Sequence, residues 1–506
     1  MPLQRFIVVI VAACQLCLGS GVAWSAENDT LQNILLRLEA LEQENAALRQ
    51  AVEGLTKDAG GMPAAVGTVP PAADSAAPQE ALQAAVQELD RPAPAPFAAP
   101  ARKDLYSANL GGGSRLRLID ISLDVLVAAG TSTAKQEELE NLQGGGHDPK
   151  RRGFTLQQAE LSLIGAVDPY FQAEAHIIAS EDEVELEEAF LQTLALPYGL
   201  ELEAGYFLTE FGRSNPTHPH AWTWLDQPVV NTRLFGGEGM RGTGLRLAKL
   251  LPTPWFSQIH FGVQNADGEF MASFLGGEIG HAHGEEEAGQ EHEELGIGGR
   301  PIVDREVRNL KDLVYLARWE NALELSRTWT GKLGISGLYG PNFTGPDGET
   351  WIYGADFLVK WLPETNRRGR PFFRLEGEFS KRDLDADDFF DELEGESIAG
   401  TTLRDWGLYL QGLYGFNSLW SAGMRYEYAS GSGDNVEHEG AYPGRRDDPF
   451  RDNRTRISPL LVYSPSEFSR IRLQYNYDHA DHLSSDAHTV WLGFEALIGA
   501  HPAHSY

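Results

Sequence analysis

Cysteine is nearly absent from this chain of 506 residues, which contains only Cys14 and Cys17. Both lie close to the amino terminus, so the rest of the chain has no thiol for a disulfide or a cysteine-based site. Positive charge is also scarce, because 41 Lys and Arg residues are set against 73 Asp and Glu residues, for a formal net charge of −32. This charge disfavours nucleic acid and anionic lipid as partners, since both would be repelled.

Long apolar runs are missing beyond the first segment of the chain. No later stretch reaches about 18 consecutive apolar residues, which excludes a second transmembrane helix, so a membrane-spanning form would have to be a barrel. The first segment places Arg5 before an apolar run at residues 6–18, followed by the small residues Ala23, Ser25 and Ala26. Residues 1–25 are therefore expected to be an export signal.

A lipid anchor is the alternative for this segment, because the sequence VAAC at residues 11–14 resembles a lipoprotein processing box. The apolar run before Cys14 is short and continues after it, which favours simple cleavage of the signal. With both cysteines inside the signal, the exported chain would contain no thiol, as suits a periplasmic or outer-membrane protein.

Residues 26–104 are predicted to form an oligomerisation helix followed by a tether. Over residues 31–55 apolar side chains recur at steps of three and four, with Asn45 in the seam. This spacing predicts a self-associating coiled coil over residues 26–58, and the alternative is an amphipathic helix that docks on its own protein. The pattern does not distinguish a dimer from a trimer. Residues 59–104 are rich in Ala and Pro and are expected to be a semi-rigid periplasmic tether or a disordered spacer.

Period-two alternation replaces the helical pattern from residue 115 onward, within the predicted barrel domain of residues 105–506. The stretch IDISLDVLV at residues 119–127 is apolar on one face and carries Asp120, Ser122 and Asp124 on the other. A soluble β-sandwich alternates in the same way, so this feature alone does not decide the fold. We predict sixteen strands, at residues 115–129, 153–167, 170–179, 186–196, 200–209, 241–250, 256–266, 312–325, 330–340, 350–362, 371–381, 403–415, 419–429, 455–463, 470–480 and 488–499.

The connections between these strands alternate in length. Short ones occur at residues 167–170 and 415–418, whereas residues 130–152, 210–240 and 267–311 form long polar loops. This asymmetry is typical of outer-membrane barrels, whose short turns face the periplasm. The sequence therefore predicts an all-β fold, a transmembrane antiparallel β-barrel of about 16 strands that is wide enough for an aqueous lumen. Its N-terminal segment is expected in the periplasm of a bacterium.

Several tryptophans lie near predicted strand ends and suit the aromatic girdles of a membrane barrel, with ordinary sheet packing as the alternative for each. They are Trp255, Trp319, Trp351, Trp361, Trp420 and Trp491.

Residues 186–213 contain a strand, the tight turn LPYG and a second strand that ends in GYFLTEFG. This arrangement resembles the phosphate-selective porin O and P family. Residues 219–231, 236–244 and 499–506 resemble related proteins labelled zinc-regulated outer-membrane receptors. The resemblance covers residues 105–506 and implies a porin-like barrel that assembles as a homotrimer, through the coiled coil and the barrel.

Two features depart from these families. Their phosphate selectivity depends on a lumen dense in Arg and Lys, whereas the inward positions expected here mix acidic and basic residues. These positions are Asp120, Asp124, Glu174, Glu201, Glu203, Arg374, Arg425, Arg470 and Arg472. A TonB-driven receptor also needs a plug domain before its barrel, and residues 27–114 do not resemble one. Neither phosphate selectivity nor receptor activity is therefore expected.

The tract GHAHGEEEAGQEHEELG at residues 280–296 falls in the longest predicted loop. Its candidate metal ligands are His281, His283 and His292 with Glu285 and Glu286. Imidazole and carboxylate suit Zn²⁺, Ni²⁺ or Cu²⁺, but the tract implies no fixed geometry, so weak and exchangeable binding is expected. The alternative is a hydrophilic loop that keeps the barrel rim soluble.

A second histidine pair, His218 and His220, lies in the predicted loop 210–240 beside Trp222, Trp224 and Asp226. A loop that folds into the lumen would narrow it, so this segment is the candidate constriction and a candidate metal site. A packed loop without a ligand is the favoured alternative, because most histidines are structural or solvated.

Catalysis is not expected. Adjacent acids such as Glu187 and Glu188 should face opposite sides of a strand, and no nucleophile elbow, Walker loop or zinc-protease motif occurs. No resident cofactor is predicted. The sequence favours passive diffusion of small hydrophilic solutes, cations or metal complexes across the outer membrane, with membrane lipid as the surrounding partner. The alternative is a barrel-anchored metal-binding or adhesive protein without a conducting lumen.

Overall fold

The computed structural model describes residues 107–111, 114–117, 119–181, 183–276, 295–364, 371–390, 397–437 and 447–499. The chain divides into two units, Met1–Arg102 and Lys103–Tyr506, and every described residue belongs to the second. The predicted export signal, coiled coil and tether over residues 1–104 lie outside the described residues and stay predictions.

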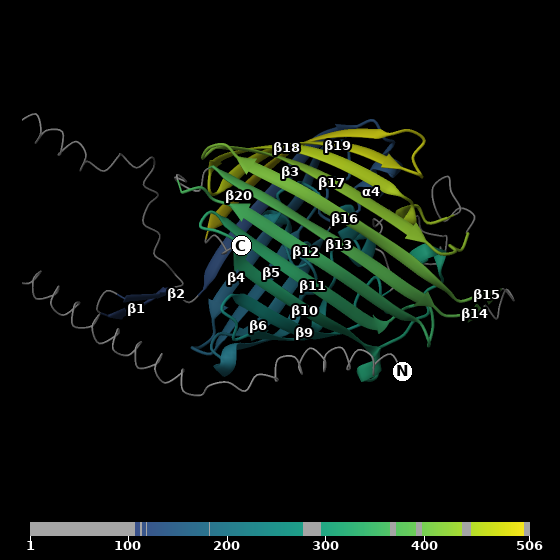
Figure 1. The fold of residues 1–506 in the computed structure, drawn as a ribbon, viewed down its shortest axis with the longest axis horizontal. Coiled ribbons are helices and arrows are strands. Elements are labelled where there is room, and N and C mark those ends of the chain that lie inside the picture. The colour runs from purple at the N-terminus through teal and green to yellow at the C-terminus, as the bar shows by residue number, and fades with distance from the viewer. Residues whose placement is uncertain are drawn as a thin grey trace, which may run out of the picture. The chain divides into compact units, whose positions relative to one another are not determined.

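Sixteen antiparallel strands close into a barrel, and Figure 1 shows them side by side and tilted. Strands pair in chain order, and the last strand pairs with the first to complete the circle. They are β3 (Asp120–Ser132), β4 (Gly153–Ala166), β5 (Phe171–Ala179), β6 (Val184–Thr193), β7 (Leu200–Leu208), β8 (Arg241–Leu250), β9 (Phe256–Asn265), β10 (Leu313–Glu324), β11 (Trp329–Pro341), β12 (Glu349–Trp361), β13 (Phe372–Ala386), β16 (Thr401–Gly415), β17 (Trp420–Ser432), β18 (Arg454–Ser466), β19 (Ser469–Ala480) and β20 (Ala487–Gly499).

The remaining elements are small and lie in connections. Two hairpins are formed by β1 (Ser107–Gly111) with β2 (Ser114–Arg117) and by β14 (Phe389–Phe390) with β15 (Ser397–Ile398). The helices are α4 (Gln136–Leu142), α5 (Val229–Phe235) and the short 3₁₀ turns η1 (Pro197–Gly199), η2 (Pro219–Ala221), η3 (Ile297–Gly299), η4 (Leu310–Asp312) and η5 (Pro449–Arg451). Among the residues that the structure describes, none of the helices has the length and apolar character needed to cross a bilayer.

The predicted strand count is confirmed, and most predicted bounds agree within a few residues. The first strand is the exception, because residues 114–117 belong to β2 and the barrel wall begins only at Asp120. The alternating pattern continues across both segments, so the sequence alone does not reveal that the chain changes pairing partner there.

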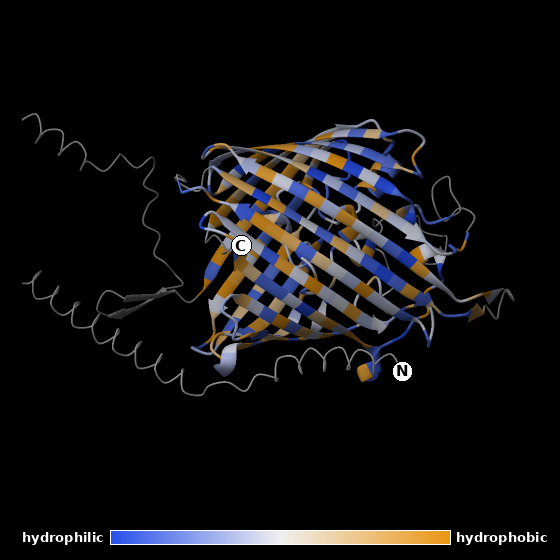
Figure 2. Ribbon diagram, viewed as in Figure 1, coloured by the Kyte–Doolittle hydropathy of each residue, from blue (hydrophilic) through white to orange (hydrophobic). Residues whose placement is uncertain are grey.

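Alternation along each strand separates the two faces of the wall, as the orange and blue residues of Figure 2 show. In β20, Val490, Leu492 and Phe494 are exposed, whereas Thr489 and Trp491 are buried. The predicted girdle position of Trp491 is therefore wrong. Its position in the strand places it on the inner face, where it packs in a buried cluster with Leu126, Leu139 and Leu225.

The connections differ between the two ends of the barrel, as predicted. We call the end with residues 133–152, 209–240 and 266–312 the long-loop end, and the opposite end the short-turn end. Side chains close several short turns. Asp168 Oδ1 accepts hydrogen bonds from two backbone amides, at 2.7 and 2.9 Å, and Asn417 Oδ1 does the same at 2.9 and 3.0 Å. Asp and Asn favour tight turns for this reason.

The interior of the barrel near the long-loop end is packed with side chains. Loop residues Phe211, Leu234, Phe235 and Met271 form one buried cluster with inward residues of the wall, including Ile352. This arrangement brings residues 209–240 inside the barrel, which is the placement that the predicted constriction requires.

Candidate functional site

A cavity of about 1360 Å³ occupies the short-turn side of the lumen, and we call it the vestibule. Its wall includes turn residues Ser418 and Glu467, so the cavity extends to the short-turn end. Its inner boundary is the inserted loop, which contributes Arg213, His218 and His220 among others. A solute that enters from the short-turn end therefore meets this loop.

Acidic residues predominate on one wall of the vestibule and basic residues on the opposite wall, although Glu320 of β10 lies among the bases and Arg470 of β19 among the acids. Asp120 and Asp124 of β3 and Glu174 of β5 lie on one side. Lys332 of β11 and Lys360 of β12 lie about half a turn away in the strand order. The mixture of acidic and basic inward residues expected from the sequence is thus present. Separated charges of this kind create an electric field across the lumen.

The inserted loop is anchored to β17, β18 and β19 by a buried carboxylate, Asp226. Arg425 donates to it, Arg456 donates at 3.0 Å, Gln474 at 2.8 Å and Asn476 at 2.7 Å. Burial raises the pKa of Asp226, but the two guanidinium groups and the hydrogen bonds outweigh it and hold this pKa at about 2. The carboxylate is therefore ionised at neutral pH and holds the loop against the wall.

Nearby aromatic residues strengthen this anchor. Trp224 is 2% exposed, donates from Nε1 to the carbonyl oxygen of Ser458 at 2.9 Å and packs against Leu460 and Val462. Arg472 donates to the carbonyl oxygens of Trp222 and Trp224 at 3.0 and 3.2 Å. The hypothesis of a packed loop is correct for this part of the segment.

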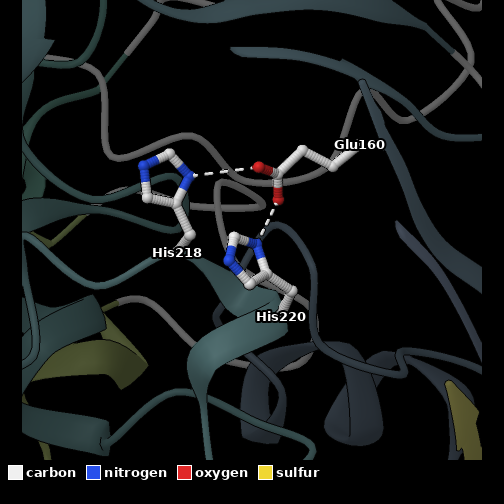
Figure 3. Close-up of side chains that lie close together, drawn as sticks. All are labelled: Glu160, His218 and His220. Atoms are coloured by element: carbon white, nitrogen blue, oxygen red, sulfur yellow. Dashed lines mark hydrogen bonds and ion pairs between the residues drawn. The ribbon is translucent and has the colours of Figure 1, made fainter. Parts of the chain in front are cut away.

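The other part of the loop brings His218 and His220 against β4. Glu160 joins the two histidines, because its Oε2 lies 2.6 Å from Nδ1 of His220 and its Oε1 lies 3.7 Å from Nδ1 of His218 (Figure 3). His176 of β5 also reaches Glu160, with 3.2 Å between Nδ1 and Oε1. The ring centroids of His176 and His218 are 4.5 Å apart.

Glu187 and Glu188 of β6 complete this group, which corrects the expectation that they face opposite sides. The pairing of β5 with β6 slips between His176 and Ile177, which leaves Glu187 as an extra residue in a β-bulge. Both acids consequently point inward and are 2% and 7% exposed. Glu187 Oε2 lies 2.7 Å from His218 Nδ1, and Glu188 Oε2 lies 2.7 Å from His218 Nε2.

The electrostatic setting of His218 favours positive charge. Burial lowers its pKa, but the carboxylates of Glu187, Glu188 and Glu160 more than offset burial and hold this pKa well above its usual value. Combinations of these side chains meet the distances required of a metal site. Glu160, His218 and His220 form one such group, and His176, Glu188 and His218 form another.

A separate group lies nearer the long-loop end. His147 Nε2 lies 2.9 Å from Glu238 Oε2 and 3.9 Å from Glu185 Oε1. Burial lowers the pKa of His147, but these two carboxylates with Glu187 raise it to about 9. Arg241 separates this group from His218, because it pairs with Glu185 at 2.7 Å and approaches Glu187 at 3.9 Å.

The sequence-predicted ligands divide into two sets. His218 and His220 lie together in the lumen, whereas the tract ligands His281, His283, Glu285, Glu286 and His292 lie outside the described residues and stay predictions. Sequence reasoning missed Glu160, His176 and Glu187. Inward parity on the predicted strands could have indicated the first two, but it could not show that they meet the loop.

Comparisons with known proteins give one sequence relative. No family model matches the chain. An uncharacterized protein of Aquifex aeolicus (strain VF5) is 30% identical over 404 residues, which are 77% of this chain and 80% of that protein.

Solved structures similar to this chain include the outer membrane channel DcaP of Acinetobacter baumannii, with 11% identity and a TM-score of 0.46. For OprB of Pseudomonas putida the identity is 10% and the TM-score is 0.45, and for an anion-selective porin from Comamonas acidovorans the identity is 8% and the TM-score is 0.43. Each match covers 75% of this chain and 97%, 94% and 99% of those chains, respectively.

Proposed function

The chain belongs to the same family as the Aquifex aeolicus protein, and we propose that it forms an outer-membrane channel through which small hydrophilic solutes diffuse passively. The observation that carries this proposal is the charged vestibule of about 1360 Å³ inside a closed barrel of sixteen strands. The proposal includes no catalytic step and no resident cofactor. The more specific likeness to phosphate-selective porins and to zinc-regulated receptors stays a prediction.

The outer face of the barrel supports insertion into a membrane. Among the described residues, fifteen of the sixteen barrel strands, all except β7, carry at least one exposed large apolar side chain. Leu333, Met424 and Leu492 are examples, each at least half exposed. Soluble proteins rarely expose apolar surface around their whole circumference, whereas a transmembrane barrel presents this surface to lipid.

The inner face supports passage of hydrated solutes. Eight acidic residues line the vestibule against six Lys and Arg residues and the charged His218, so the acids exceed the positive groups by one. We therefore propose a modest preference for cations, because a local excess of negative charge raises the concentration of cations. The inserted loop narrows the lumen, so the solutes are expected to be small. The acidic residues are Asp120, Asp124, Glu174, Glu188, Glu210, Glu320, Glu467 and Glu495, and the basic ones are Arg213, Arg318, Lys332, Lys360, Arg374 and Arg470.

Single-channel recording in planar bilayers tests this proposal. Purified full-length protein should give stepwise conductance, and its reversal potential in a KCl gradient should report a cation preference. Heat-modifiable migration on gels confirms that the barrel is folded. Folded protein without conductance would contradict the channel and favour the alternative of a barrel that anchors surface loops.

We also propose that three copies assemble, through the coiled coil predicted for residues 26–58 and through contacts between barrels. Native mass spectrometry of the full chain in detergent should give the mass of three copies. A mass of one or two copies would contradict the trimer without affecting the channel proposal.

A further inference from the structure

Three imidazoles and four carboxylates meet on one wall of the vestibule, from four segments of the chain. The inserted loop supplies His218 and His220, and Figure 3 shows both imidazole rings turned toward the carboxylate of Glu160. We call these seven residues the lumen cluster. They are His218, His220, Glu160 of β4, Glu174 and His176 of β5, and Glu187 and Glu188 of β6.

The spacing of the donor atoms fits a small metal ion. Ligands about 2.1 Å from Zn²⁺ at a tetrahedral angle lie about 3.4 Å apart. In the structure the separation is 2.6 Å for His220 Nδ1 and Glu160 Oε2, 3.7 Å for His218 Nδ1 and Glu160 Oε1, and 2.7 Å for His218 Nδ1 and Glu187 Oε2. Shifts smaller than about 1 Å would bring these atoms to ligand spacing.

Two buried atoms of the cluster face each other as ion-pair partners. His218 Nδ1 and Glu187 Oε2 are buried and lie 2.7 Å apart. Glu187 as a whole is only 2% exposed. A buried carboxylate oxygen needs a positively charged or hydrogen-bonding neighbour, and a metal ion in place of the imidazole proton would bind both atoms.

The cluster also lacks fixed positive charge. Within the described part of the chain, neither Lys nor Arg forms an ion pair with Glu160, Glu174 or Glu188. The guanidinium of Arg241 reaches Glu187 only at 3.9 Å and pairs mainly with Glu185, and that of Arg470 donates to the backbone carbonyl oxygen of His220. Four buried or half-buried carboxylates therefore need a cation, which is either a proton on each imidazole or a metal ion.

We propose that Glu160, His218 and His220, with Glu187 as a fourth ligand, bind a divalent transition-metal ion in the lumen. Two nitrogen and two oxygen ligands suit Zn²⁺ and Co²⁺. Binding itself does not require an open channel. Its effect on conductance rests on the proposed function, because an ion held at the boundary of the vestibule would fix the loop across the path.

The competing interpretation is that the imidazoles are protonated and only hold the loop by ion pairs. Metal binding by the purified protein separates the two. The sequence tract with His281, His283 and His292 would also bind metal, so all measurements use the full chain with H281N, H283N and H292N as the background.

Cobalt titration of this background, followed by visible absorbance, is the first experiment. Tetrahedral Co²⁺ absorbs more strongly than octahedral Co²⁺, so the spectrum reports the expected geometry. We expect one Co²⁺ per chain at saturation. His218→Gln and His220→Gln should each weaken cobalt binding by at least about 10-fold. Loss of a residue that only supports a metal ligand already weakens metal binding by about 10-fold to 100-fold, so loss of a ligand should not cost less. Competition with Zn²⁺ should displace the cobalt.

The matched control is His260→Gln, which alters a buried inward-facing histidine of β9 that contacts Arg246 rather than the lumen cluster. It should leave cobalt binding unchanged. Glu187→Gln keeps the volume of the side chain and removes its charge, so it replaces His218→Gln as the test variant if His218→Gln does not fold. Equal cobalt affinity in the background and in folded His218→Gln or Glu187→Gln protein would overturn the metal site, as would failure of the background to bind cobalt.

Bilayer recordings with ZnCl₂ then separate the two proposals. Zinc should reduce the conductance of the background but not that of His218→Gln. Cobalt binding in a folded barrel that never conducts would support the metal site and contradict the channel. Conductance that zinc leaves unchanged, in protein that binds no cobalt, would contradict the metal site and support the channel.

Discussion

At the scale of single residues, the electric field across the vestibule predicts the effect of removing one charge. Lys360 lies on the basic wall, opposite the acids of β3 and β5. A unit charge about 7 Å from a passing ion in water contributes about 0.6 kcal/mol, and screening at about 0.1 M salt halves this value. Because the sign is opposite for K⁺ and Cl⁻, the two terms add to about 0.6 kcal/mol, which corresponds to about threefold in relative permeability. Lys360→Gln should therefore increase the permeability of K⁺ relative to Cl⁻ by about twofold to threefold, as measured by reversal potentials.

The control for this prediction is Lys311→Gln, which removes an exposed lysine of η4 at the long-loop end. It changes the net charge of the protein equally but lies away from the vestibule. A shift of the same size in both variants would mean that the net charge, and not the vestibule, sets selectivity. High salt should reduce the effect of Lys360→Gln, because it screens the field.

The candidate site shows which single residues a sequence can and cannot assign. His218 and His220 stand out because two histidines with prolines between strands are unusual, and their place in an inserted loop could be predicted. Glu187 could not be assigned, because strict alternation turns only one of Glu187 and Glu188 inward and the β-bulge is what allows both to face the lumen. Trp491 was misassigned because a tryptophan near a strand end can face either the lipid or the interior of the barrel, and this one is buried inside.

At the scale of elements, Asp226 is the residue on which the inserted loop depends. Asp226→Ala would leave the buried guanidinium groups of Arg425 and Arg456 without their partner. Removal of one partner from a buried ion pair costs about 3–5 kcal/mol. We expect the loop over residues 209–240 to leave the wall, with a larger single-channel conductance and a lower unfolding midpoint.

The comparison for this variant is Asp481→Ala, which removes an exposed carboxylate that accepts only from Asn453 among the described side chains. This variant should change neither the single-channel conductance nor the unfolding midpoint. Unchanged conductance in a folded Asp226→Ala protein would show that the loop does not limit the path, even if the unfolding midpoint falls.

Strands were predictable because each wall segment obeys one local rule, alternation of apolar and polar side chains. The path of the inserted loop could not be predicted from the sequence, because its contacts join distant parts of the chain. Asp226 meets Arg456, which lies 230 residues later in the sequence. No local pattern identifies such a pair. The sequence could suggest that a long loop folds inward, but not that it holds β17, β18 and β19 on one side and β4, β5 and β6 on the other.

At the scale of the whole molecule, the exposed apolar side chains on the outer face of the strands predict that lipid surrounds the barrel. Ile335 tests it, because it is the middle residue of β11 and is 54% exposed. Its neighbours across the strands are Trp319 and Ala355. Arginine on the lipid face at the bilayer midplane destabilises a barrel by about 2–4 kcal/mol. Ile335→Arg should lower the free energy of unfolding from lipid vesicles by this amount.

Leu310→Arg is the matched control, because Leu310 is even more exposed, at 73%, but lies in η4 at the long-loop end. In water an exposed leucine and an exposed arginine cost nearly the same, so this variant should change the free energy by less than about 0.5 kcal/mol. Denaturant titrations of both variants in vesicles give the comparison. Equal effects at the two positions would mean that the middle of β11 faces water. A large effect at Ile335 alone would place the hydrocarbon layer around the centre of the strands, so that the lumen is the polar path between its two sides.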